Sequence, residues 1–220
     1  MTIEVNGSTI QYETIGSGKP VLMLHGFPVD HRLMTGCMEP ISQTLPDYRR
    51  IYIDLPGLGQ SKAAPDLHTA EAMLQTLVGF IRAVLGRERF LVAGESYGGF
   101  MTLGLLTTDI AAQLDGALLL CPRIRYEMDP ALTPKKPLLT ADAALLAREQ
   151  SEAFKGFLEY AVVATPETWA RYQADVEPGL AAADPAFVQG YDNGGYAPAR
   201  LAQLESLTFD RPVCFVLGRQ

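Results

Sequence analysis

The stretch Phe90-Leu-Val-Ala-Gly-Glu-Ser-Tyr-Gly-Gly99 decides the fold of this chain. Its first four residues are typical of a buried strand, and a run rich in small and apolar residues from Gly98 to Thr107 predicts a helix. The sequence Gly94-Glu-Ser-Tyr-Gly98 between strand and helix is typical of a nucleophile elbow, a turn too tight for side chains at its flanking glycines. Such a turn strains the serine and exposes its Oγ. Ser96 is therefore the candidate nucleophile, and the alternative is a glycine-rich turn that only allows close packing of helix on strand.

A second loop, His25-Gly-Phe-Pro28, follows another apolar run. Since the carboxyl ends of parallel strands meet at one edge of a sheet, we expect this loop beside the candidate nucleophile. Acyl transfer needs two amides directed at the developing oxyanion, and those of Phe27 and Tyr97 are the candidate donors. Gly26 completes the loop motif, and His25 is expected to bond loop backbone rather than to act as a base.

Further apolar runs of strand length and one segment with helical spacing continue the alternation of strand and helix. Asn6-Gly7 between alternating residues predicts a hairpin, and apolar residues at helical spacing from Ala70 to Leu85 predict a helix that ends at Gly86. Strands buried on both faces and separated by helices predict an α/β fold, a mostly parallel sheet with helices on both faces. The predicted strands are Thr2–Val5, Thr9–Ile15, Pro20–Leu24, Arg50–Ile53, Phe90–Ala93, Ala117–Leu120 and Val213–Leu217.

The pattern changes between Pro122 and Leu207, where no run of strand type occurs. Apolar spacing predicts helix from Thr140 to Val163, while Thr165-Pro166 and Asp184-Pro185 have the cap and proline of helix starts. A last short helix is predicted from Arg200 to Leu207. The expected organisation is a core at residues 1–121, an all-helical cap at 122–208 and a core strand at 209–220.

Composition excludes several classes of function. The 220 residues, 48% hydrophobic and 20% charged, are typical of one globular domain, and a net charge of −7 disfavours binding to nucleic acid. No apolar run approaches the ~20 residues of a membrane span. Three widely spaced cysteines and an N-terminus without a leader predict a cytoplasmic protein in which each cysteine is a small buried residue. No metal-ligand spacing occurs, so neither a metal nor a cofactor is expected.

Three motifs, His25–Pro28, Asp54-Leu-Pro-Gly-Leu-Gly-Gln-Ser61 and Gly94–Gly99, resemble in order and spacing those of the α/β-hydrolase fold superfamily. The helical insertion resembles the cap domain of that superfamily. The resemblance implies the roles given above for the serine and the two amides, and a small, partly apolar substrate bound largely by the cap. The dehalogenase and epoxide hydrolase branches have aspartate at the elbow, so the serine here resembles the esterase, enol-lactonase and carbon–carbon hydrolase branches.

The resemblance also implies a triad acid after strand seven and a histidine after strand eight. The chain has three histidines, and all of them precede Ser96. Pro212–Gln220 resembles strand seven and the loop that would carry the acid. Val213–Leu217 is apolar on both faces and would be left as an uncovered edge strand. We therefore expect a truncated chain, with the triad acid and histidine beyond Gln220. The open edge of the sheet is expected to favour self-association.

Other polar residues are weaker triad candidates. His31 is expected at the surface or bonded to Asp30, and His68 near the N-terminal cap of the helix that follows it. Glu127 and Asp129 are expected to be solvated charges at the hinge of the cap.

The predicted function is hydrolysis of an ester, lactone or similar carbonyl substrate through the serine. One alternative is a catalytically impaired or non-catalytic hydrolase-like protein that binds a ligand, since the acid and histidine are absent from the chain. Another is a cofactor-free peroxidase-like or lyase activity, because this fold does not fix the reaction.

Overall fold

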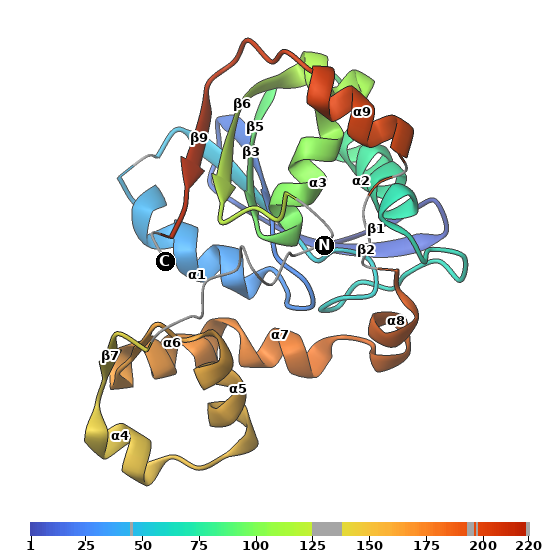
Figure 1. Ribbon diagram of the computed structural model, residues 1–220. Helices are drawn as coiled ribbons and strands as arrows, with labels where there is room; N and C mark the ends of the chain where they lie inside the picture. Colours follow the sequence, from blue (N-terminus) through green and yellow to red (C-terminus); the bar gives the residue numbers. More distant parts are fainter. Residues whose placement is uncertain (45, 125–137, 193–195, 197, 219–220) are drawn as a thin grey trace.

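A seven-stranded sheet with the order β1-β2-β4-β3-β5-β6-β9 forms the centre of the molecule (Figure 1). The computed structural model describes residues 1–44, 46–124, 138–192, 196 and 198–218. β1, β2 and β4 pair antiparallel, and every later pair of neighbours is parallel. The strands are β1 Thr2–Val5, β2 Ser8–Ile15, β3 Lys19–Leu24, β4 Tyr48–Ile53, β5 Phe90–Glu95, β6 Leu114–Leu120 and β9 Val213–Val216.

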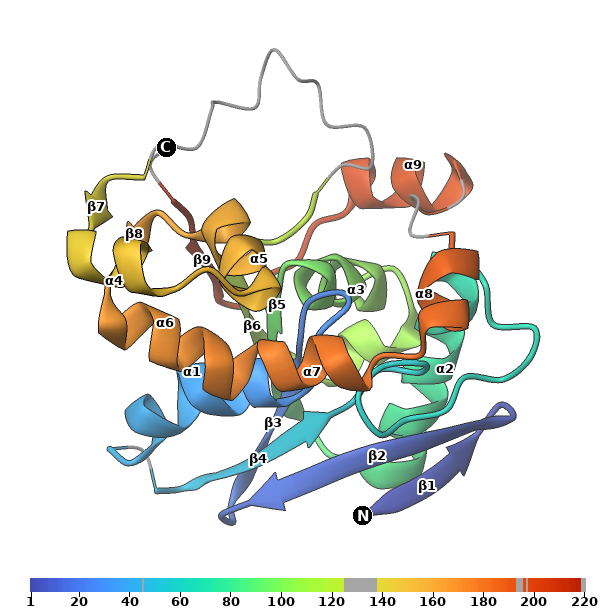
Figure 2. The ribbon, with the colours of Figure 1, turned by 90° about the horizontal axis from the view of Figure 1, so that it is seen from below.

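Helices cover both faces of the sheet, as the sequence predicts (Figure 2). α1 packs on one face around Met23, Met34 and Tyr52, and α2 and α3 pack on the other face over the larger core. No helix among the described residues is both long enough and apolar enough to cross a bilayer. The helices are α1 Arg32–Ser42, α2 Ala70–Val84, α3 Tyr97–Leu105, the 3-10 helix η1 Asp109–Gln113, α4 Ala143–Arg148, α5 Glu152–Tyr160, α6 Pro166–Asp175, α7 Glu177–Ala182, α8 Pro185–Gly190 and α9 Pro198–Ser206.

The parallel register brings the carboxyl ends of the central strands level. Leu24 at the end of β3 lies opposite both Ile53 of β4 and Gly94 of β5, and Glu95 lies opposite Leu120 of β6. The apolar strand residues are almost fully buried, and each such side chain contributes about 1.5–3 kcal/mol. The loops that follow these strands therefore meet at one edge of the sheet.

α2 confirms the helix predicted from spacing alone. The Thr69 hydroxyl caps it by accepting the amide of Ala72 at 3.2 Å, and Arg82 in the last turn complements the helix dipole. The apolar stripe, which includes Leu74 and Leu77, is buried against the sheet and α3.

Residues 138–192, here called the helical segment, correct the prediction of an all-helical insertion with one helix over 140–163. Two short parallel strands, β7 Thr140–Ala141 and β8 Val163–Ala164, pair at its base, and α4 and α5 lie between them. The predicted helix is broken because the Ser151 hydroxyl accepts the Phe154 amide at 3.1 Å and starts a new helix. The predicted starts of α6 and α8 are confirmed, with Thr165 and Asp184 as the capping residues.

α1 is not predicted from the sequence, because Gly36 and Pro40 interrupt its helical pattern. The prediction of buried cysteines is wrong, since Cys37, Cys121 and Cys214 are all free and exposed. Cys37 lies on α1, Cys121 directly follows β6, and Cys214 lies on β9 at the edge of the described sheet. At such an edge even an apolar strand keeps its side chains in solvent.

Candidate active site

Ser96 occupies a strained turn between β5 and α3. Its φ is 49° and its ψ is −110°, values that cost a residue with a side chain about 1–3 kcal/mol. Close packing explains the two flanking glycines of the motif. A Cβ on Gly98 would lie 2.8 Å from the His25 carbonyl oxygen, and a Cβ on Gly94 would lie 2.6 Å from Thr102 Oγ1.

The elbow presents the serine hydroxyl to the start of a helix. Among the described residues, Ser96 Oγ has no hydrogen-bond partner, and its side chain does not cap α3. The first amides of a helix have no acceptor within the helix, so Tyr97 directs an unsatisfied N–H to the same end of α3. The Ser96 hydroxyl and the Tyr97 amide therefore lie side by side at the carboxyl edge of the sheet.

The loop after β3 contacts the elbow as the sequence predicts. A Cβ on Gly26 would lie 3.2 Å from Ser96 Cβ and would collide with Glu95 Oε2, so a side chain here would force Glu95 to move. The next residue, Phe27, packs its ring edge-on against Tyr97 with centroids 5.8 Å apart. In the described part of the chain, the Phe27 amide donates to no other residue. The structure thus brings together Ser96 and the two residues expected to supply oxyanion donors.

His25 is fully buried, with both ring nitrogens bonded to loop backbone. Nδ1 lies 2.7 Å from the Gly26 carbonyl oxygen, and Nε2 accepts the Leu55 amide at 3.0 Å. Burial lowers the pKa of His25, although the bond to Gly26 opposes that shift. The neutral ring joins the loop after β3 to the loop after β4.

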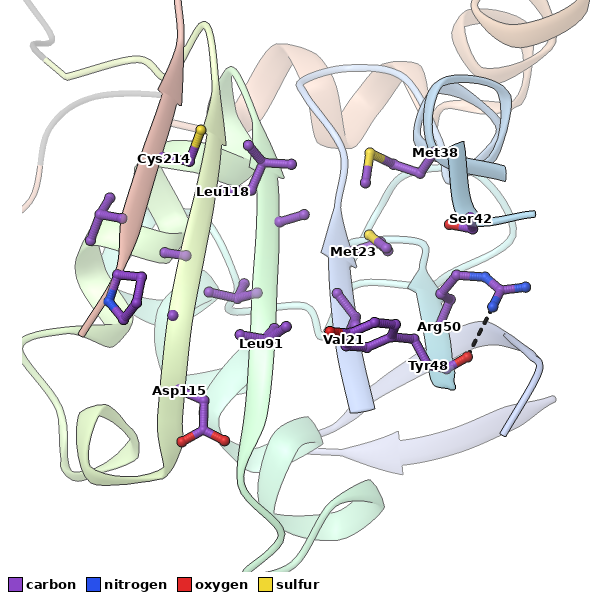
Figure 3. A pocket seen from close by; sticks show the side chains of 16 residues that line it. Val21, Met23, Met38, Ser42, Tyr48, Arg50, Leu91, Asp115, Leu118 and Cys214 are labelled. Carbon is purple, nitrogen blue, oxygen red and sulfur yellow. Dashed lines mark hydrogen bonds between the residues drawn. The ribbon is translucent and has the colours of Figure 1, made fainter. Parts of the chain in front are cut away.

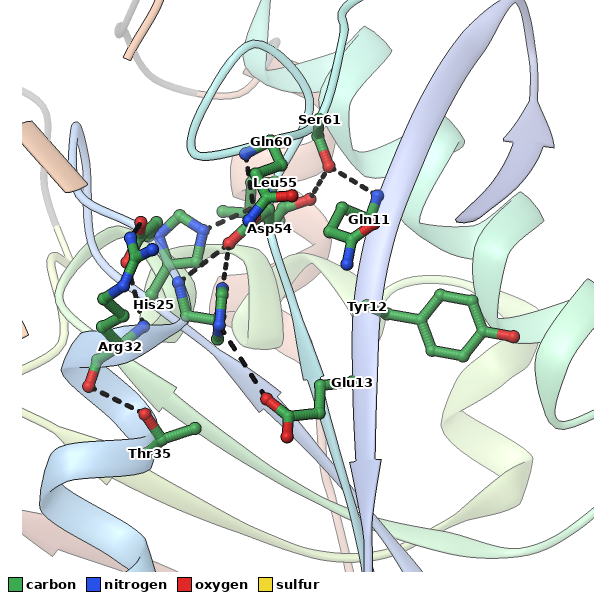
Figure 4. Close-up of polar contacts among 12 residues, drawn as sticks. Gln11, Tyr12, Glu13, His25, Arg32, Thr35, Asp54, Leu55, Gln60 and Ser61 are labelled. Atoms are coloured by element: carbon green, nitrogen blue, oxygen red, sulfur yellow. Dashed lines mark hydrogen bonds and ion pairs between the residues drawn. The ribbon is translucent and has the colours of Figure 1, made fainter. Parts of the chain in front are cut away.

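His31 bonds to Asp54, which corrects the expectation of a surface position or a bond to Asp30. Figure 4 shows Asp54 among its polar contacts. Its Nδ1 lies 2.6 Å from Asp54 Oδ1, and its backbone amide donates to the same oxygen at 2.9 Å. Asp30 instead pairs with Arg32. On the other side, His31 Nε2 lies 4.0 Å from Glu13 of β2. The imidazole therefore connects a buried carboxylate to a half-exposed one.

Hydrogen bonds within the Asp54 loop hold its shape. Asp54 Oδ2 accepts the Gln60 amide at 2.9 Å, and its carbonyl accepts the Ser61 hydroxyl at 2.6 Å. Burial raises the pKa of Asp54, but the hydrogen bonds from His31 and Gln60 outweigh it and hold that pKa below its usual value. Asp30, His31 and Asp54 offer ligand atoms within 4.8 Å of one another, yet each is already engaged in these pairs.

Glu95, next to Ser96 in the chain, is a residue of the candidate site that sequence reasoning missed. Burial raises the pKa of its carboxyl to about 7, and the adjacent Gly26 amide only partly opposes that shift. Its negative charge also contributes to the raised pKa of Cys37, after burial of the thiol itself. Nothing in the sequence distinguishes Glu95 from a solvated elbow residue.

The helical segment lies over the site loops (Figure 2). Gly179 of α7 packs on the backbone of Asp30, where a Cβ would lie 2.6 Å from the amide nitrogen. The Asp184 amide before α8 donates to the Gly57 carbonyl at 3.2 Å, and the ring of Phe187 packs on the same glycine. These contacts place α7 and α8 directly above the loops after β3 and β4.

None of the chain's three histidines hydrogen-bonds to Ser96. His25 and His31 have the partners given above, and His68 is exposed, with its carbonyl accepting the Asp192 amide at 2.8 Å. Glu127 and Asp129, expected as hinge charges, lie outside the described residues.

A cavity of about 380 Å³ lies on the α1 face of the sheet, away from the elbow (Figure 3). Its wall residues on β5, Leu91 to Ala93, precede Ser96 along the strand. Val21 and Met23 of β3 and Cys214 of β9 also line it, so the cavity is mostly apolar. It is a gap over the middle of the sheet and not the site formed by the strand ends.

Comparison with known proteins identifies relatives of this arrangement. A model of the alpha/beta hydrolase family matches residues 21–218. An epoxide hydrolase 2 from Siraitia grosvenorii is 34% identical over 102 residues, 46% of this chain and 31% of that protein. A pimeloyl-[acyl-carrier protein] methyl ester esterase from Shewanella woodyi is 39% identical over 54 residues, 24% of this chain and 20% of that protein.

The similarity in structure is more extensive than the similarity in sequence. The crystal structure of an alpha/beta superfamily hydrolase from Oenococcus oeni PSU-1 superposes with a TM-score of 0.82 at 27% identity, covering 100% of this chain and 83% of that one. The chain spans less than half the length of the curated relatives it matches.

Proposed function

Because this chain belongs to the α/β hydrolase family, we propose that it hydrolyses an ester, lactone or similar carbonyl substrate with Ser96 as nucleophile. The observation that carries the proposal is the strained backbone of Ser96, φ 49°, between β5 and α3. Strain of this kind persists where the surrounding structure requires it, and such sites are often functional.

The proposed chemistry uses the groups gathered at the elbow. Ser96 Oγ attacks the carbonyl carbon and the carbonyl oxygen becomes an oxyanion, which the amides of Phe27 and Tyr97 stabilise. The bond to the leaving group then breaks, and the alcohol departs with the proton that the serine hydroxyl has lost. Water adds its OH to the acyl carbon and returns a proton to Ser96 Oγ, which releases the acid. Each oxyanion donor is worth about 10²–10³ in rate, and α3 adds the favourable end of its dipole.

A serine, and not a carboxylate, at the elbow favours acyl chemistry. The relatives include an esterase and an epoxide hydrolase, so their names alone do not choose between the reactions. A hydroxyl forms an acyl ester that water can cleave at the same carbonyl carbon.

We further propose that residues 122–208 act as a cap over a small, partly apolar substrate. The seating of α7 and α8 on the site loops supports this role, as does the aromatic character of Phe27, Phe187 and Tyr191 beside the elbow. The chemistry needs no cofactor or metal.

A second candidate is a hydrolase-like protein that binds its ligand without turnover. It is favoured by one observation, that no histidine of the chain hydrogen-bonds to Ser96. Without a base to take its proton, serine attacks weakly, although an oxyanion hole alone retains some rate.

Ser96→Ala separates the two candidates. For the hydrolase, a 4-nitrophenyl ester should be cleaved by the wild type, and Ser96→Ala should lower that rate by about 100-fold or more. Ser206→Ala, which removes a hydroxyl from α9, is the matched control and should keep full activity. Binding of the ester without cleavage, at an affinity that Ser96→Ala leaves unchanged, would establish the second candidate instead.

A further inference from the structure

Tyr191 contacts both residues to which the oxyanion amides are assigned. Its ring stacks on Phe27 with centroids 5.6 Å apart and an interplanar angle of 23°. It meets the ring of Tyr97 edge-on at 6.2 Å, and the two tyrosine hydroxyls are hydrogen-bonded to each other. Since Phe27 also packs on Tyr97, three rings from three separate parts of the chain form one closed contact.

Contacts with α8 and with the start of α2 hold Tyr191 in position. Its amide donates to the Phe187 carbonyl at 2.8 Å, and its ring stacks on the Phe187 ring at 5.0 Å. The next residue, Asp192, donates its amide to the His68 carbonyl and bridges to Thr69 at the start of α2. Tyr191 is thus held by α8 on one side and by the core on the other.

Both hydroxyls of the pair are buried. Tyr191 is 5% exposed and Tyr97 is 1% exposed. Burial raises the pKa of each phenol, so both stay protonated at neutral pH and each can donate or accept. Removing one hydroxyl would leave the other without its partner in a dry environment, which disfavours the present arrangement of the rings.

We propose that Tyr191 is a positioning residue for the oxyanion hole, setting the distance between the Phe27 and Tyr97 amides through its contacts with both side chains. The inference rests on the proposed function, in which these amides stabilise the oxyanion. Phe27 lies on the loop after β3 and Tyr97 on α3, and Tyr191, from a third part of the chain, contacts both. Displacements well under 1 Å at such donors reduce rates markedly.

The test uses two reagents that modify serine once, diethyl 4-nitrophenyl phosphate and its phosphorothioate. Ser96 Oγ forms a bond to phosphorus, the bond to the aryl oxygen breaks, 4-nitrophenolate leaves, and the serine proton passes to solvent. The P=O oxygen depends on the two amides, whereas sulfur is a weak acceptor and gains little from them. The ratio of the two rates therefore reports on the oxyanion hole.

Tyr191→Leu should slow the reaction with the phosphate about 10-fold and the reaction with the phosphorothioate less than about 2-fold. Tyr191→Phe keeps the ring and tests the hydroxyl alone, and it should lower the ratio of the phosphate rate to the phosphorothioate rate by about 3-fold. If Tyr191→Leu does not fold, Tyr191→Phe serves as the test. Tyr196→Phe is the matched control. Tyr196 is also buried, and its hydroxyl bonds the Phe100 carbonyl at 2.5 Å, yet its ring stacks on Phe100 and on neither oxyanion residue.

A wild-type ratio in both Tyr191 variants, or an equal fall in Tyr196→Phe, would overturn the positioning role while leaving Ser96 as the nucleophile. If neither reagent modifies wild-type Ser96, the proposed function fails and this inference falls with it.

Discussion

His31 and Asp54 are joined by a hydrogen bond of 2.6 Å between Nδ1 and Oδ1 that connects the loops after β3 and β4. Asp54 is completely buried and His31 largely so. The pair lies at the carboxyl edge of the sheet, where the loops around Ser96 begin. Its protonation state therefore affects the stability of this edge.

We expect the stabilisation by His31 to decrease as pH rises. The hydrogen bond to Asp54 raises the pKa of His31 above 6.5, so folding favours the protonated ring. The stabilisation is complete below the unfolded-state pKa of about 6.5 and is lost as pH rises through the folded-state pKa. The gap in Tm between wild type and His31→Gln should be largest near pH ~6 and shrink towards pH ~9. His68→Gln, at an exposed imidazole, is the control, and a gap that grows with pH would contradict the assignment.

Glu95→Gln should stabilise the protein increasingly as pH rises. Burial raises the pKa of Glu95 from 4.5 to about 7, so the fold disfavours the charged form. Wild type loses stability between these two values, whereas the amide does not titrate. At about pH 8 the variant should gain at most about 3 kcal/mol in unfolding free energy, and near pH ~4 the two should be equal. Urea unfolding at both pH values measures this, with Glu205→Gln on α9 as the surface control. An equal effect at both pH values would show that Glu95 does not titrate near neutrality.

Gly98→Ala should destabilise the elbow by about 3 kcal/mol, because the new methyl group would press on the backbone carbonyls of Leu24 and His25. Gly190→Ala at the end of α8 is the control, since a Cβ there would meet no atom within 4 Å. Thermal unfolding of the two variants compares them directly. Equal Tm values would mean that β3 and α3 are not packed as closely as described.

All three cysteines should react with iodoacetamide in the folded protein, since each is exposed. Cys37 should react more slowly than the other two, because its thiol is partly shielded from water although the residue is exposed. This desolvation, and then the nearby Glu95, raise the pKa of the thiol and reduce the thiolate fraction. Mass spectrometry of partially alkylated protein gives the order, with the denatured chain as the reference for equal reactivity. Protection of Cys214 would show that the β9 face is covered in solution.

Local patterns in the sequence predict most of the sheet and the elbow, because each depends on neighbouring residues. The turn at Ser96 requires glycines at fixed positions, and buried parallel strands read as unbroken apolar runs. Contacts between distant segments are not predictable in this way. Tyr191 and Phe27 are far apart in sequence, and either could equally have packed within its own helix or loop. The sequence likewise predicts a surface position for His31 or a bond to neighbouring Asp30, whereas its partner, Asp54, comes from another loop.

The helical segment has one part that rests on the site loops and another that has its own apolar core and contacts the sheet domain through α6 and α1. α7 and α8 rest on the site loops through Gly179 and Phe187, so changes there are transmitted to the reacting groups. α4, α5 and α6 instead build a separate apolar core around Trp169 and Phe154. Mutations in that outer core leave the contacts of Gly179 and Phe187 with the site loops in place. Under the proposed function, substrate preference can therefore change through side chains that do not touch the turn at Ser96.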